Sequence, residues 1–394
     1  MEEWKKYKLG EITSKIGSGA TPKGGRDSYL GGNIALIRSQ NVLDFSFSKL
    51  GLAYINEVQA EKLSNVEVYE KDVLLNITGD SVARVCIVPN NVLPARVNQH
   101  VAIIRGNDKV DYRYLLYYLQ YIKPQLLSLS QGGATRNALT KKMIEELEVK
   151  MPSKGIQKEI VSILYALDSK IELNRRINDN LEQQTQALFK SWFVDNPKPN
   201  WSETTFSEVA NFIGGYSYKG EELTDSSNIA MVTIKNFGRN GGFKADGFKG
   251  IAPFVKLKEC HYANLFDILV AHTDLTQNAD VIGNAELLLT YGRYDGIIFS
   301  MDLVKVLPKN NFPYRFLLAA MLKNKIFKGH CLGYVNGTTV LHLNKKALPE
   351  FEIRIPSEYE ARTMNDTFAI LSKWQRCYKK MTGLFAFVTH FFRN

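Results

Sequence analysis

The fold is decided by residues 156–194, which read IQKEIVSILYALDSKIELNRRINDNLEQQTQALFKSWFV. Apolar side chains recur here at alternating intervals of four and three residues, at Ile160, Leu164, Leu167, Ile171, Leu181, Leu188 and Trp192. Asn174, Asn178 and Thr185 occupy the same phase, and no Pro or Gly interrupts the run. A 3.5-residue period held for so long is typical of a coiled-coil seam. We therefore expect a helix of roughly 36 residues, about 54 Å long, that needs a partner to cover its seam.

The last segment of the chain supplies a candidate partner. From Ser357 the spacing returns, with apolar or aromatic residues at Met364, Phe368, Leu371, Tyr378, Phe385 and Phe392. Polar Gln375, Thr382 and Thr389 interrupt it, and polar seam positions fix register and partner at some cost in stability. We expect the two helices to pair with each other in antiparallel orientation. The alternative is that they are two unrelated surface helices.

The chain also contains an internal repeat with a period of about 200 residues. Trp4 and Leu9–Gly17 match Trp201 and Phe206–Gly214, and Asn33–Asn41 matches Asn228–Asn236. Each half ends in Pro-Ser, at Pro152 and Pro356, with the Ser placed to cap the heptad helix that follows. The repeat predicts two equivalent globular domains, each followed by a long helix.

Within each half the pattern predicts an α+β domain of about 150 residues. We expect short helices at 11–16 and 208–213 and longer ones at 112–128 and 314–328. The expected strands are 34–38, 73–77, 85–88 and 101–105, then 229–234, 268–271, 297–300 and 303–307. The fold class is thus α+β, with domains at 1–152 and 197–356 held apart by an antiparallel two-helix coiled coil formed by 153–196 and 357–394.

Composition narrows the function classes. The 394 residues are 45% apolar and 23% charged, with a formal net charge of +10. Residues 1–152 and 196–356 are both net basic, whereas residues 153–195 carry six basic and six acidic side chains. Two basic modules joined by a neutral spacer favour a polyanionic partner.

Nothing in the sequence indicates secretion or a membrane. Residues 1–9 are charged and lack the apolar run of a signal peptide, and no apolar stretch approaches the ~20 residues of a membrane helix. The cysteines, Cys86, Cys260, Cys331 and Cys377, are widely separated, as expected for reduced thiols. We expect a cytoplasmic protein.

The chain resembles the specificity (S) subunit of type I restriction–modification systems over nearly its full length. The resemblance is carried by the ordered duplication of several segments: the Trp4 and Trp201 starts, the strand and loop 37–42, the segment from Gly132 to Lys142, and the helix 156–192. It implies a non-catalytic subunit that binds a bipartite DNA site. It also implies that two methyltransferase subunits, which methylate adenine N6, dock on the chain, and that restriction/translocase subunits join them. S-adenosylmethionine, ATP and Mg are then expected on those partners, with no cofactor and no metal in this chain.

Enzymatic interpretations have little support. An adenine methyltransferase needs a Gly-rich cofactor loop and an Asn/Asp-Pro-Pro-aromatic motif, and neither occurs. The loop 17–25 lacks the Gly-Lys-Ser/Thr ending of a phosphate-binding loop. Cys260-His261 and His330-Cys331 have poor spacing for zinc, and the first half has no counterpart. Asp72 and Asp267 precede strands equivalently and are expected to shape turns.

DNA contact needs Arg, Lys, Asn, Gln, Ser or Thr at base edges and cations on phosphates. The loop candidates in the first domain are Lys23, Arg26, Arg38, Arg84, Arg96, Asn98 and Arg136. Those in the second are Lys219, Lys235, Arg239, Lys244, Thr273, Gln277, Asn278 and Arg293. The competing hypothesis for each is a solvated surface group.

Three function classes follow. The leading one is the DNA-recognition subunit of a type I complex, in which the helix length sets the spacer between two half-sites. The second is a fused endonuclease–methyltransferase, and the third is a coiled-coil scaffold that does not read DNA.

Overall fold

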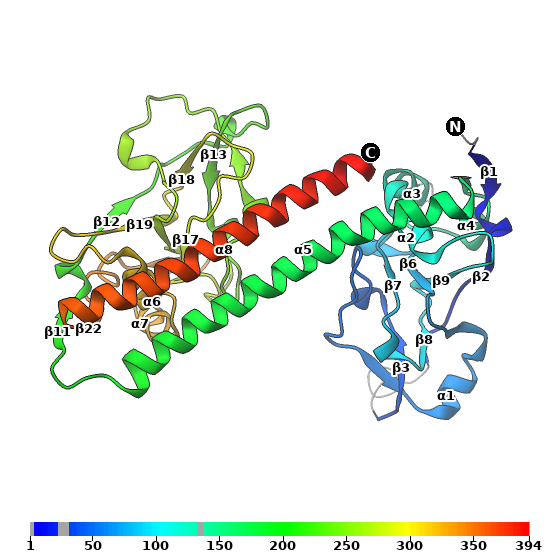
Figure 1. The fold of residues 1–394 in the computed structure, drawn as a ribbon, viewed down its shortest axis with the longest axis horizontal. Helices are drawn as coiled ribbons and strands as arrows, with labels where there is room; N and C mark the ends of the chain where they lie inside the picture. Colours follow the sequence, from blue (N-terminus) through cyan, green and yellow to red (C-terminus); the bar gives the residue numbers. More distant parts are fainter. Residues whose placement is uncertain (1–3, 23–30, 132–136, 394) are drawn as a thin grey trace. The chain divides into compact units, whose positions relative to one another are not determined.

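The computed structural model describes residues 4–22, 31–131 and 137–393, with side chains as far as Phe385. The chain forms two compact units, residues 1–168 with 388–394 and residues 169–387. Each unit is a mixed α+β structure (Figure 1).

The first unit contains two four-stranded sheets and a two-stranded ribbon. Their orders are β2-β9-β6-β7, β4-β3-β8-β5 and β1-β10, with a parallel pair β3/β8 inside the second sheet. The strands are β1 Lys5–Lys8, β2 Thr13–Ser18, β3 Ile34–Ile37, β4 Ala53–Ile55, β5 Glu67–Val68, β6 Val73–Asn76, β7 Val85–Ile87, β8 Ala95–Val97, β9 Val101–Gly106 and β10 Glu148–Met151. The helices are α1 Glu57–Glu61, α2 Tyr112–Tyr121, α3 Lys123–Ser130 and α4 Lys141–Glu145.

The second unit repeats this plan. Sheets β12-β19-β15-β17 and β14-β13-β18 correspond to those of the first unit, again with a parallel pair, β13/β18, and a ribbon β11-β22. The strands are β11 Ser202–Thr205, β12 Ala210–Gly214, β13 Ile229–Val232, β14 Lys249–Gly250, β15 Ile268–Ala271, β16 Thr273–Asp274, β17 Ala285–Leu287, β18 Gly296–Phe299, β19 Leu303–Pro308, β20 Val335–Asn336, β21 Leu341–Leu343 and β22 Glu352–Ile355. The helices are α6 Arg315–Leu322, α7 Lys325–Leu332 and α8 Glu358–Arg393. In both units the N-terminal strand pairs with the last strand before the long helix, so each domain closes on itself.

A buried acidic residue occupies the same place in both repeats. Asp72 accepts a hydrogen bond from Tyr69 N and forms a two-point ion pair with Arg105, both at 2.7 Å. Asp267 accepts from Asn264 N and lies 3.3 Å from Arg315. These carboxylates shape the turns before β6 and β15, as the sequence predicts, and the ion pairs offset the cost of burying their charge.

The long helix α5, Lys154–Phe189, continues into a π-helical turn, Lys190–Asp195. In the second unit it packs against α8: the rings of Trp192 and Phe368 are 5.5 Å apart, and Gln375 Nε2 donates to Glu182 Oε2 at 3.2 Å. Higher numbers on α5 meet lower numbers on α8, so the pairing is antiparallel, as predicted.

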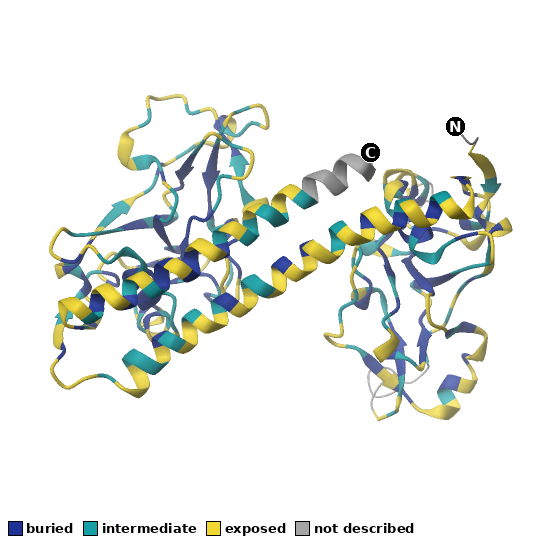
Figure 2. Ribbon diagram, in the orientation of Figure 1, coloured by how far each residue is buried: buried dark blue, intermediate teal, exposed yellow. Residues whose placement is uncertain are grey.

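Burial follows the heptad phase along both helices (Figure 2). Leu164, Ile171, Asn174, Leu181, Phe368, Leu371 and Gln375 are buried, whereas Ile160, Leu167, Asn178, Leu188, Tyr378 and Phe385 are half-buried. Leu181, Phe368 and Leu371 belong to the same apolar core as the helix α6 of the second unit. The seam in this unit is therefore shared between the partner helix and the globular domain.

Four local predictions of helices are wrong. Residues 11–16 and 208–213 were expected to be helical, but they end single 3₁₀ turns and begin the strands β2, Thr13–Ser18, and β12, Ala210–Gly214. The period of Ile12 and Ile16 fits a helix, but pairing with β9 overrides that local preference. The helix expected at 112–128 is broken into α2 and α3 near Ile122, because Pro124 lies in the first turn of α3 and cannot continue α2. The helix expected at 314–328 is also divided, into α6 and α7, because the Asn324 side chain caps a new helix that begins at Lys325. Among the described residues, no helix is both long and apolar enough to cross a membrane.

Candidate nucleic-acid interface

In both units a buried Asn anchors the loop that follows the first strand of the parallel pair, β3 or β13. Asn236, fully buried, accepts from Thr233 N at 2.9 Å and donates to Lys244 O at 2.8 Å. Asn41, also fully buried, accepts from Arg38 N at 3.0 Å and donates to Ser48 O at 2.9 Å. One side-chain amide thus joins the two ends of each loop, which explains why the repeat 33–41/228–236 ends in Asn.

Beyond this anchor, the loop of the second unit presents polar groups to solvent. Gly241 and Gly242 have φ angles of +87° and +89°, and a Cβ at Gly238 would lie 2.2 Å from Gly241 O. Glycine is needed for this tight turn because other residues would be strained or would clash. Arg239 and Lys244, on either side of the turn, are exposed. We refer to residues 237–248 as the recognition loop of the second unit.

Two further loops contact the recognition loop. Arg239 Nε lies 3.8 Å from Asp280 Oδ2, two residues beyond Asn278, and Gln277 Nε2 donates to Thr338 O at 2.6 Å. On the other side, the ring of Phe248 packs edge-on against Tyr294, next to exposed Arg293. The structure therefore groups five of the predicted DNA-contact residues on adjoining loops: Arg239, Lys244, Gln277, Asn278 and Arg293.

Three predicted contact residues do not lie in exposed loops. Arg96 is in strand β8, only 7% exposed, and its guanidinium donates to Glu67 at 3.1 Å and to Ala60 O at 3.2 Å. Asn98 is 4% exposed and accepts from His100 N. Thr273 is buried in β16. These groups stabilise their own domains, so we leave them out of the interface.

The remaining candidates are less tightly grouped. Lys235 is exposed on the turn Ile234–Asn236, and Lys219 is exposed before the turn Gly220–Glu222. Arg38 is half-buried and donates to Gly51 O at 2.6 Å, which places it at the base of the 42–52 loop, and Arg84 is half-buried before β7. Lys23, Arg26 and Arg136 lie outside the described residues.

Sequence reasoning missed a cluster of basic side chains in the second unit. His272 lies next to His342 and Lys345, beside the small sheet β16-β21-β20. Burial and these two neighbours lower the pKa of His272. The sequence does mark this cluster, because the two repeats differ here: His272 of the second half stands where the first half has Ile77.

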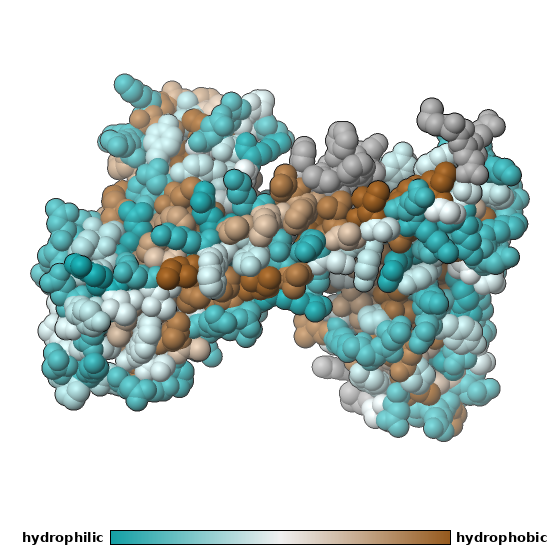
Figure 3. Space-filling model, viewed as in Figure 1, coloured by the Kyte–Doolittle hydropathy of each residue, from teal (hydrophilic) through white to brown (hydrophobic). Residues whose placement is uncertain are grey.

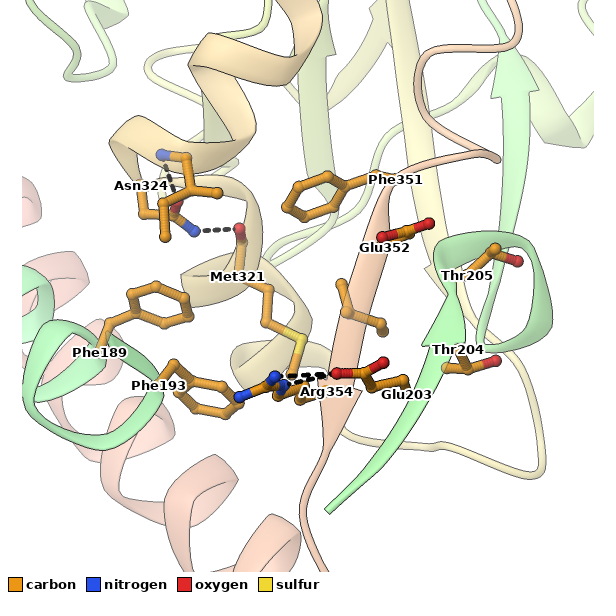
Figure 4. A pocket seen from close by; sticks show the side chains of 12 residues that line it. Phe189, Phe193, Glu203, Thr204, Thr205, Met321, Asn324, Phe351, Glu352 and Arg354 are labelled. Carbon is orange, nitrogen blue, oxygen red and sulfur yellow. Dashed lines mark hydrogen bonds and ion pairs between the residues drawn. The ribbon is translucent and has the colours of Figure 1, made fainter. Parts of the chain in front are cut away.

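A cavity of about 480 Å³ lies in the second unit (Figure 4). The rings of Phe189 and Phe193, the side chain of Met321 and the strand β22 line it. Its cation, Arg354, is paired with Glu203 at 2.9 Å. A cavity that is lined by Glu203 and Glu352, and whose cation is neutralised, does not suit a polyanion. Among the described residues, no group of three or more His, Cys, Asp or Glu side chains gathers as a metal site.

The family model for the type I restriction modification DNA specificity domain matches residues 1–183 and 198–377, one match for each half. It describes a specificity domain and not a catalytic one.

Two curated relatives share part of the sequence. The chain is 29% identical over 202 residues to the type I restriction enzyme HindI specificity subunit of Haemophilus influenzae, a match that covers 50% of this chain and 42% of the relative. It is 27% identical over 197 residues to the MjaIX specificity subunit of Methanocaldococcus jannaschii, covering 49% and 44%. The matches thus span less than half the length of either relative.

A solved structure has the same fold. The S subunit of the type I restriction–modification system from M. genitalium superposes with a TM-score of 0.60 over 100% of this chain and 95% of that one, at 16% sequence identity.

Proposed function

Because the chain belongs to the family of type I restriction–modification DNA specificity proteins, we propose that it is the non-catalytic subunit that selects the DNA sequence, each globular domain reading one half of a bipartite site. Methylation of adenine N6 and cleavage are then the work of partner subunits, which carry S-adenosylmethionine, ATP and Mg.

This proposal rests on one observation: the two domains share a scaffold but differ in the loops that the scaffold exposes. Both domains have the same parallel strand pair and the same buried Asn anchor, at Asn41 and Asn236. The loops that these anchors hold differ in sequence, and the second exposes Arg239 and Lys244. A shared scaffold with different exposed side chains is what two unlike half-sites require.

Selection from a random duplex library tests the proposal. The full chain, with and without a methyltransferase partner, is incubated with the library at fixed salt, and the bound DNA is sequenced. We expect enrichment of two short sequences separated by an unspecified spacer. Binding without enrichment would contradict sequence recognition, and no binding at all would favour the scaffold alternative.

The two domains can be assigned to their half-sites by substitution. Arg239→Ala with Lys244→Ala in the second domain should weaken selection at one half-site only. Each lost phosphate contact should also reduce the slope of log affinity against log salt by about 0.9. Unchanged affinity and selection in this double variant would remove these residues from the interface.

We also propose that the helices dock the methyltransferase subunits. A second series of apolar residues runs along α8 with 4,3 spacing, outside the buried seam: Ile370, Trp374, Cys377, Met381 and Leu384. Ile370, Trp374 and Leu384 are each at least 50% exposed. Apolar atoms can be followed along the helices in the space-filling view (Figure 3). This spacing suits a partner that is itself helical, and the proposed occupant is a helix of the methyltransferase subunit.

The length of α5 supports a third part of the proposal, that the helices set the spacer. Its 36 residues correspond to about 54 Å, or about 16 base pairs of DNA. Half-site centres near one helical turn or somewhat more apart would leave several unread bases between them.

A further inference from the structure

A buried lysine in the second unit joins three separate elements. Lys323, at the C-terminal end of α6, lies 2.8 Å from Glu182 of α5 and 3.0 Å from Glu286 of β17. Gln375 of α8 donates to the same oxygen of Glu182. The helix pair is thus connected to the edge strand of the main sheet through one ammonium group.

This cluster is charged and largely removed from water. The side chain of Lys323 is 13% exposed and that of Glu286 is 5% exposed. Burial lowers the pKa of Lys323, but the two carboxylates more than offset this, so the net shift is upward. Burial by itself raises the pKa of Glu182, but the contacts with Lys323 and Gln375 outweigh it and bring the pKa below its ordinary value. Lys323 therefore stays protonated where it meets the two carboxylates.

The connection continues from Glu286 into the recognition loop. Glu286 Oε2 faces Lys323, while its other oxygen, Oε1, accepts a hydrogen bond from Gly242 N at 2.6 Å. Lys379 of α8 donates to Phe243 O at 3.4 Å, next to that glycine. The backbone of the turn between Arg239 and Lys244 is therefore held at two successive residues by groups that the helix pair orients.

The first unit contains an analogous connection built from different side chains. Tyr117 of α2 donates to Asp168 of α5 at 2.7 Å, and its ring lies 5.9 Å from that of Phe45 in the 42–52 loop. Gln120, one turn further along α2, donates to Asp44 of the same loop at 3.0 Å. Both repeats thus link the long helix, through the helix after β9 or β19, to the loop that the buried Asn anchors.

We propose that Lys323 and Glu286 are positioning residues for DNA recognition. They connect the helix pair to the backbone of the 237–248 loop and fix its conformation, so that a partner bound to the helices changes recognition of one half-site. This inference rests on the proposed function and adds a route between the partner-docking helices and the DNA-contacting loop. The route lies within the second unit.

The decisive variant removes the charges of Lys323, Glu182 and Glu286 together. Replacing one member of a buried ion pair leaves an uncompensated charge and can unfold a protein, whereas replacing both with neutral residues of similar size is often tolerated. We therefore choose Lys323→Met with Glu286→Gln and Glu182→Gln in the full chain, because Glu182 also pairs with Lys323. The matched control is Arg354→Met with Glu203→Gln, which neutralises an exposed pair of the same unit that lies on the ribbon β11-β22.

Two readouts are needed. Hydrogen exchange measured by mass spectrometry reports protection of the amides in residues 237–248, and we expect exchange at least tenfold faster there in the variant but not in the control. Selection from the random duplex library, with the methyltransferase partner present, should lose at least tenfold enrichment at one half-site. This should be the half-site weakened by the double substitution Arg239→Ala and Lys244→Ala, and the other should keep its wild-type enrichment.

The outcomes separate the inference from the function on which it rests. Wild-type exchange in the loop together with wild-type selection at both half-sites would overturn the inference and leave the proposed function standing. Equal loss at both half-sites with a lowered melting temperature would also overturn it, because general destabilisation would explain the loss. If the wild-type chain itself selects no sequence, the proposed function fails. The exchange measurement then still decides whether the connection through Lys323 and Glu286 positions the loop.

Discussion

At the scale of single residues, the amides of Asn41 and Asn236 are the best-defined feature of the candidate interface. Each is fully buried and satisfies both ends of a loop, so its removal leaves backbone groups without partners. The sequence repeat pointed to both residues, but it did not give their role. An Asn at a strand end is as compatible with base contact as with a structural anchor, and burial distinguishes the two.

Asn236→Ala should lower the free energy of unfolding by about 2 kcal/mol, because it leaves the buried Thr233 amide unpaired and removes the shorter of the two hydrogen bonds to the Lys244 carbonyl. Urea unfolding of the full chain measures this. Asn240→Ala, on the exposed part of the same loop, is the control and should change stability by less than about 0.5 kcal/mol. Equal effects of the two substitutions would contradict the anchor role.

Glu360 gives the second unit a predictable response to acid. Hydrogen bonds from Lys198, Ser357 and Trp201 lower its pKa from 4.5 to about 2. Because the folded pKa is depressed, the stabilisation is complete above pH about 4.5 and is lost as the pH falls toward 2. Glu360→Gln should therefore be less stable than wild type at pH 7, and the difference should shrink between pH 5 and pH 3. Urea titrations across that range measure it, and parallel curves would contradict the assignment.

At the scale of elements, the heptad period predicted α5 and α8 well because the pattern is long and uninterrupted. Short elements were predicted less well. The segment 11–16 has apolar residues four apart, as a helix does, yet Ile16 pairs across to Ile104 of β9. Partners more than 80 residues away decide such a segment, and no local pattern contains them. The loop placement of Arg96 failed for a related reason, since β8 is too short to show a period.

The exposed series on α8 makes a prediction at this scale. Trp374→Ser should reduce co-purification of the methyltransferase subunit at least tenfold, because an exposed aromatic at a helical interface carries a large share of the binding energy. The melting temperature of the isolated chain should stay unchanged, since the side chain is 55% exposed there. Lys373→Ser, one residue away and also exposed, is the matched control. Full retention of the partner by Trp374→Ser would place docking on another surface.

At the scale of the whole molecule, the internal repeat was the most informative part of the sequence, since a family match in each half and two sheets of equivalent order bear it out. Individual DNA contacts were much less predictable. A charged loop residue and a buried, paired one look alike in sequence, as Arg239 and Arg96 demonstrate. The connection through Lys323 was not predicted, because its residues are scattered over almost 200 positions of the sequence: Glu182, Glu286, Lys323 and Gln375.

The spacer proposal gives a prediction for the complete assembly. Inserting one heptad into both α5 and α8 adds about 10 Å to each helix and should lengthen the unread spacer by about three base pairs. Mapping the methylated adenines made by the assembled complex measures this. A heptad inserted into α5 alone shifts the register of the pair and should lower stability instead. An unchanged spacer in the doubly extended protein would show that helix length is not the ruler.

The buried Asn236 has an evolutionary consequence. Because its amide closes the loop at the base, substitutions at the exposed positions 239, 240 and 244 of this segment change the surface that faces solvent without removing a hydrogen bond from that amide. Such a segment can drift in sequence while its domain keeps folding. New preferences can then arise by single substitutions in a lineage that never passes through an unstable ancestor.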